Sequence, residues 1–170
     1  MALIIEDGSI VLGADSFVSL ADARSLALSY GWQLPTDDTK AEQALRNGAK
    51  YISLYERQFS GSRISIDQTL SWPRKDARNA QGFDIPQASI PNDVKCAQVA
   101  AAFEYGQGID VRASNNGLSI ASEEVTGAVK QSYHNNGKRG NTISLTKVTD
   151  CLQSLLVRSS NAFGFNVTRG

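Results

Sequence analysis

Three of the four prolines and one of the two tryptophans lie between residues 70 and 91, in the stretch LSWPRKDARNAQGFDIPQASIP. Proline removes a backbone donor and disfavours the helical conformation in the residue before it. The stretch is therefore predicted to form neither a long helix nor a central strand, although helix-like sequence lies on both sides of it. It is expected to be a long crossover that serves as a catalytic loop, a binding loop or a folding device.

Apolar residues at helical spacing predict four helices around this crossover. The strongest pattern steps by four and three from Ala41 to Phe59, with Gly48 on the apolar face, where we expect another backbone to approach closely. The helix that starts at Pro91 and ends at Gly106 is apolar on most sides, so it is either central to the fold or covered by a neighbouring subunit. The other two are a short helix from a Ser19–Asp22 capping box to Gly31 and a helix of about residues 145 to 157.

Two other segments have no helical pattern. Residues 107–143 are rich in Gly, Asn, Ser and Thr, and Asn136-Gly137 is a strong hairpin turn pattern, so this segment is predicted to be a β-hairpin arm. The last residues, 159–170, carry two phenylalanines that the tail cannot bury alone.

The predicted fold is mainly α: a small bundle of about four helices with a β-hairpin arm and an extended C-terminal tail. We expect one domain over residues 1–170, with a helical core at 1–106 that includes the crossover 58–90, the arm at 107–143, a C-terminal helix at 144–158 and the tail at 159–170.

Composition and charge limit the function. The formal net charge of the 170 residues is zero, which argues against tight, salt-resistant nucleic-acid binding as the main task. No apolar stretch reaches the roughly 18 residues of a membrane span, and the N-terminus lacks a secretory signal pattern. Residues 1–42 carry seven acidic and two basic side chains, whereas residues 125–170 carry one acidic and six basic side chains. Such opposed charges suit self-association or are simply a segregated solvated surface.

No pattern in the sequence predicts catalysis, a cofactor or a metal. The single histidine, His134, has no neighbouring partner for catalysis or metal binding, and we interpret it as a turn residue. Residues 76–84 lack the ligand spacing of a calcium loop, and residues 137–141 lack that of a phosphate loop. The two cysteines, Cys96 and Cys151, are far apart in the sequence and are interpreted as small core side chains in a reducing compartment.

The crossover residues Trp72, Pro73 and Arg74 have two interpretations. In the favoured one they are structural: the indole is buried against the helices, and Arg74 reaches helix C-terminal carbonyls or a carboxylate such as Glu56. In the other, an aromatic ring beside a cation forms a platform for single-stranded bases.

The order of motifs along nearly the whole chain resembles a family of tailed-phage proteins. The motifs that carry the resemblance are SFVSLADA at 16–23, LSWPR at 70–74, the Ile-Pro pairs at 85–86 and 90–91, and the terminal Arg-Gly. Members of this family are often labelled DnaT-like single-stranded-DNA-binding proteins, and they look like head-to-tail connector adaptors of the phage neck.

The resemblance implies a structural virion protein that is not an enzyme. Twelve copies would form a ring between the portal and the tail or next connector protein, and genomic double-stranded DNA would pass through it non-specifically. Assembly would occur in the bacterial host cytoplasm, away from membranes. The resemblance further implies that the C-terminal tail docks on the portal through Phe163, Phe165, Val167 and Arg169, and that Lys138 and Arg139 face the DNA channel or a neighbour. The alternative function is single-stranded-DNA binding of the DnaT-like type in replication.

Overall fold

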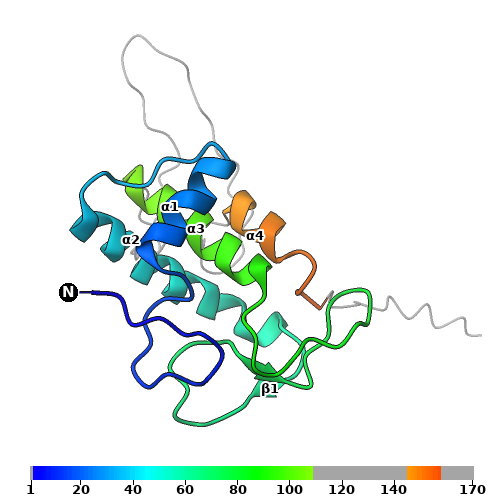
Figure 1. Ribbon diagram of the computed structural model, residues 1–170. Coiled ribbons are helices and arrows are strands. Elements are labelled where there is room, and N and C mark those ends of the chain that lie inside the picture. Colours follow the sequence, from blue (N-terminus) through cyan, green and yellow to red (C-terminus); the bar gives the residue numbers. More distant parts are fainter. Residues whose placement is uncertain (1, 109–144, 158–170) are drawn as a thin grey trace, which may run out of the picture.

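The computed structural model describes residues 2–108 and 145–157, and these form a small, mainly α-helical fold (Figure 1). The helices are α1 (Leu20–Ser29), α2 (Asp38–Ile52), α3 (Asn92–Gly106) and α4 (Thr146–Leu152), and a 3-10 helix, η1 (Ser53–Gln58), continues α2. Two short strands, β1 (Ser62–Arg63) and β2 (Arg74–Lys75), pair antiparallel within the crossover. In Figure 1 the long non-helical segments lie together at one end of the helices.

The first two helices each begin after a side chain that caps them, and the capping box of α1 was predicted. Ser19 Oγ accepts the backbone N–H of Asp22 at 3.1 Å and donates to the Asp22 carboxylate at 2.6 Å, which confirms the side-chain interaction of the capping box. Asp37 caps α2 by accepting the N–H of Lys40 at 2.8 Å.

Helix α3 is the centre of the fold. Nine of its residues are buried, and it contacts α1, α2 and α4. A Cβ placed on Gly48 of α2 would lie 2.6 Å from the carbonyl oxygen of Gln98, which confirms the close backbone approach predicted at this glycine. The sequence left open whether α3 is central to the fold or covered by a neighbouring subunit. In the structure it is central, and α1, α2 and α4 of the same chain cover it.

Gln98, on α3, is fully buried and joins three segments. Its Oε1 accepts the N–H of Phe17 at 2.8 Å, and its Nε2 donates to Ser16 Oγ at 2.7 Å and to the Leu45 carbonyl at 2.9 Å. Each bond spans more than fifty residues of sequence, so this amide satisfies polar groups that helix packing would otherwise leave unpaired.

A second buried polar group, Glu6, organises the N-terminal loop. Its carboxylate accepts the N–H groups of Gly8, Ile10 and Val11 at 2.9 to 3.1 Å. These bonds hold together a segment that forms no helix or strand of its own. Among the described residues, the extended pairing of this loop is a single parallel bridge between Ile5 and Ser16.

Two predicted helices are shorter than expected. The pattern from Ala41 to Phe59 continues beyond α2, but residues 53–58 turn more tightly as η1. Phe59 is nevertheless buried, because the pattern records which side chains face the core and not the type of helix. Helix α4 ends at Leu152 instead of residue 157, because the chain then pairs with η1 and Phe59: the Val157 N–H donates to the Gln58 carbonyl, and Leu156 bridges Phe59.

Candidate functional site

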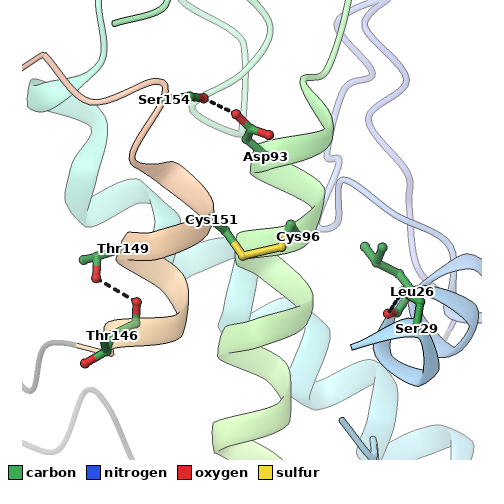
Figure 2. Close-up of a disulfide and its surroundings, with 8 residues drawn as sticks. All are labelled: Leu26, Ser29, Asp93, Cys96, Thr146, Thr149, Cys151 and Ser154. Carbon is green, nitrogen blue, oxygen red and sulfur yellow. Dashed lines mark hydrogen bonds between the residues drawn. A yellow bond between two sulfur atoms is a disulfide. The ribbon is translucent and has the colours of Figure 1, made fainter. Parts of the chain in front are cut away.

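A broad groove of about 1610 Å3 opens between α1, α3 and α4. Its walls come from α1, from α4 with the residues after it, and from the crossover loop 78–82; the first turns of α3 also line it. Figure 2 shows α4 beside α3, with Leu26 and Ser29 of α1 across from the disulfide. The charged, aromatic and sulfur-containing side chains that line the groove are Asp22, Tyr30, Trp32, Arg78, Asp93, Lys95, Cys96, Lys147, Asp150 and Cys151.

Aromatic rings stack at one edge of this groove. Tyr30 lies on Trp32 with ring centroids 4.7 Å apart and planes 17° apart, and Trp32 lies 6.2 Å from Phe103 at 23°. Trp32 is partly buried by these contacts, whereas Tyr30 remains 54% exposed. The Lys147 ammonium lies 5.2 Å from the centre of the Phe103 ring, within the range of a cation–π contact.

The charged groups of the groove are balanced. Lys147 pairs with Glu104 at 2.5 Å, and Arg78 pairs with Asp84 at 2.7 Å, although both side chains of the second pair are more than half exposed. Such exposed pairs are weak and exchange easily for other partners. Lys95 is the third cation of the groove, beside Lys147 and Arg78. Three carboxylates line the same groove, those of Asp22, Asp93 and Asp150.

Cys96 and Cys151 form a disulfide between α3 and α4, so the prediction of two unpaired, reduced side chains is wrong (Figure 2). Their Cα atoms are 5.8 Å apart, within the range of a disulfide, because α4 packs directly on α3. A separation of 55 residues hides this proximity in the sequence. Ser154, which follows α4 and also lines the groove, donates a short hydrogen bond to Asp93 of α3.

The crossover residue Trp72 lies in the core and is 1% exposed. Its ring meets Phe59 edge to face at 5.6 Å, and its indole N–H has no hydrogen-bond partner among the described residues. Pro73, which follows a cis peptide bond, is buried as well, and its carbonyl accepts from Gln68 Nε2 at 2.8 Å. A ring without exposed surface offers no face to a nucleic-acid base, so this position does not form a stacking platform in the described structure.

Arg74 is also buried and donates to three backbone carbonyls, those of Ser60, Gly61 and Ser71. Its guanidinium lies 3.7 Å from Glu56, but the closer partner of that carboxylate is Arg63, which donates to both of its oxygens at 2.5 and 2.7 Å.

Glu56, Arg63 and Arg74 form a charged cluster, and their contacts shift the pKa values of its members. The hydrogen bond from Arg63 lowers the pKa of Glu56, with smaller contributions from the charges of Arg63 and Arg74, against the opposing effect of burial. Burial lowers the pKa of Arg74. The cluster joins η1 to the crossover and contains no nucleophile or unpaired base.

Several of the residues that sequence analysis selects lie outside the described part of the chain. They are Lys138 and Arg139 of the predicted arm, His134 beside them, and Phe163, Phe165, Val167 and Arg169 of the predicted tail. Within residues 2–108 and 145–157, no group of three His, Cys, Asp or Glu side chains is placed to hold a metal ion. In the same residues, no helix has the length and apolar character needed to cross a membrane.

Sequence analysis did not identify the aromatic stack. Tyr30 and Trp32 are only two residues apart, on either side of Gly31 just after α1, and this Tyr-Gly-Trp sequence is the local pattern that points to the stack. Phe103 comes from α3, more than seventy residues later, so its contribution depends on helix packing.

The fold and the groove together define a small, mainly helical protein whose described residues form a groove lined by aromatic and charged side chains. A family model described as "Putative DnaT-like ssDNA binding protein" matches residues 1–170, and the chain belongs to this family. No curated protein and no solved structure matches it.

Proposed function

We propose that this protein binds single-stranded DNA in the groove between α1, α3 and α4, with a base stacked on Tyr30. The observation that carries the proposal is the Tyr30–Trp32–Phe103 stack, whose outer ring is half exposed at the edge of the groove. Proteins that bind single strands without sequence preference combine aromatic stacking with nearby cations, and any base can stack because each has a π face. The family description supports the same class of ligand.

The charges of the groove predict moderate, weakly salt-dependent affinity. Lys95, Lys147 and Arg78 supply at most three phosphate contacts, and the groove's own carboxylates oppose them. For a single strand, the slope of log K against log salt is about −0.7 per neutralised phosphate, so we expect a slope no steeper than about −2. Stacking on the aromatic ring would then contribute a large share of the binding free energy.

Fluorescence anisotropy with a labelled oligothymidylate tests this proposal. Tyr30→Ala should weaken binding by roughly 5- to 150-fold, because stacking on one aromatic ring is worth about 1 to 3 kcal/mol per base. Leu28→Ala is the matched control: Leu28 lies on α1, two residues before Tyr30, is 78% exposed and does not line the groove. Equal affinity of the Tyr30 variant and the wild type, or no binding by the wild type, would refute the assignment.

The second candidate is a ring-forming adaptor of the phage neck, and exposed apolar loops favour it. Ile66 is 95% exposed and Leu12 is 79% exposed. Their loops meet where the Gly13 N–H donates to Thr69 Oγ1 at 3.2 Å. Large exposed apolar side chains on adjoining loops are typical of a surface that binds protein. In this proposal the partners are further copies of the chain, the portal and the next connector protein, in the neck of the virion.

Native mass spectrometry with and without the portal protein tests the adaptor. A stable assembly on the portal, weakened by deletion of the residues after Ser160, would support the adaptor and the assignment of Phe163, Phe165, Val167 and Arg169 to docking. A monomer that never joins the portal yet binds single-stranded DNA would exclude the adaptor. Normal assembly of the truncated chain would exclude only the docking role of the tail.

A further inference from the structure

Helix α4 depends on α3 for its position. It has seven residues and no side-chain cap at its N-terminus, and isolated helices of this length are not stable in water. Val148 and Leu152 of α4, and Leu155 after it, pack in the main core. Two polar contacts also join α4 and its following turn to α3, namely Lys147 with Glu104 at 2.5 Å and the hydrogen bond from Ser154 to Asp93. The covalent link between the two helices is the Cys96–Cys151 disulfide.

The disulfide is accessible from the groove. Both cysteines line it; Cys96 is 8% exposed, and Cys151 is more exposed. A small dithiol that enters the groove can therefore reach the sulfur of Cys151 first. Access of this kind distinguishes an exchangeable disulfide from a fully buried structural one.

A separate part of the core does not depend on α4. The cluster between α1, α2 and α3 consists of Val18, Ala23, Ala27, Ala44, Leu45, Val99 and Ala102. None of these residues belongs to α4. Release of α4 would therefore leave the packing of the other three helices at this cluster in place.

We propose that Cys96–Cys151 is a site of thiol–disulfide exchange, and that its reduction by a dithiol lets α4 separate from α3 more readily, which opens one wall of the groove. A thiolate of the dithiol attacks the Cys151 sulfur, the disulfide bond breaks, and the Cys96 thiolate leaves and takes up a proton. The second thiol of the reagent then attacks the mixed disulfide and releases Cys151. In total the protein gains two electrons and two protons, and the dithiol becomes a disulfide. This proposal does not depend on what the groove binds.

Hydrogen exchange read by mass spectrometry, with dithiothreitol as the reductant, tests the proposal on the full chain. Reduction should accelerate amide exchange in residues 145–157 by at least about tenfold, because the cross-link no longer limits the separation of α4 from α3. Exchange in α2 should change little. The Cys96→Ser/Cys151→Ser double variant is the matched control: its exchange should resemble that of the reduced protein and should not respond to dithiothreitol.

Three results would overturn the proposal. In the first, residues 145–157 exchange at the same rate in the oxidised and reduced protein. In the second, α2 and α4 lose protection equally, which would make the disulfide a staple of the whole fold. In the third, alkylation without reductant modifies both cysteines of the freshly purified protein, which would show that the bond is absent.

Discussion

Replacement of Trp72 by alanine tests the role of the crossover. The side chain is 1% exposed and packs edge to face on Phe59, in the core cluster that α2, α3 and α4 share. Removal of a large buried aromatic side chain generally costs about 3 to 5 kcal/mol. In the part of the chain that the structure describes, the indole N–H has no partner. A buried unpaired donor costs about 1 to 3 kcal/mol, so removal of this N–H offsets part of the loss. We therefore expect Trp72→Ala to lower the free energy of unfolding by about 3 kcal/mol.

Urea denaturation followed by far-UV circular dichroism measures this loss, and thermal melting should fall by about 6 to 12 °C for a chain of this size. Trp72→Phe is the matched control because it keeps an aromatic ring in the core and removes the unpaired N–H, so it should cost less than half as much. The reasoning fails if Trp72→Ala unfolds like the wild type. If that variant also lost affinity for single-stranded DNA selectively, the ring would belong to a binding surface.

Three further predictions concern other parts of the molecule. Gly48→Ala should destabilise the protein by about 1 to 2 kcal/mol in urea denaturation, although alanine favours a helix, because the new Cβ would meet the Gln98 carbonyl oxygen; a stabilised variant would contradict this. Arg63 lowers the pKa of Glu56 in the fold below its ordinary value of 4.5, so this contribution to stability is present above about pH 4.5 and is lost as the pH falls through the lowered pKa. Glu56→Gln should therefore flatten the acid side of the stability profile measured by thermal melting, and an unchanged profile would refute the coupling. Titrations with oligothymidylate at several salt concentrations should give a slope no steeper than about −2, and a slope near −5 would indicate a phosphate-binding surface beyond the groove.

Local sequence patterns predict most of the described helices. Spacing and capping residues locate α1 and the start of α2 because these depend on neighbours in the chain. The ends of α2 and α4 are predicted less well, since η1 and the strand-like pairing of Leu156 with Phe59 depend on partners far away in the sequence. The two-stranded pairing of β1 with β2 inside the crossover was not predicted for the same reason.

The candidate site depends almost entirely on helix packing. Cys96 and Cys151 have no metal-like or motif-like spacing, and only the contact between α3 and α4 makes them a pair. Tyr30 and Trp32 are two residues apart just after α1, but Phe103 completes the stack from α3. Periodicity indicates which side chains face inwards, but it does not indicate which helices become neighbours.

The hydrogen bonds of Gln98 have a consequence for how the chain selects one arrangement of its helices. The amide meets Phe17, Ser16 and Leu45 together only when α2, α3 and the N-terminal loop have all reached their native positions. If α3 slid along α2 by one residue, apolar contacts between small side chains would largely re-form, whereas the buried amide and its three partners would be left unpaired at about 1 to 3 kcal/mol for each group. A core rich in alanine discriminates poorly between such alternatives, so one glutamine supplies much of the register specificity of this fold.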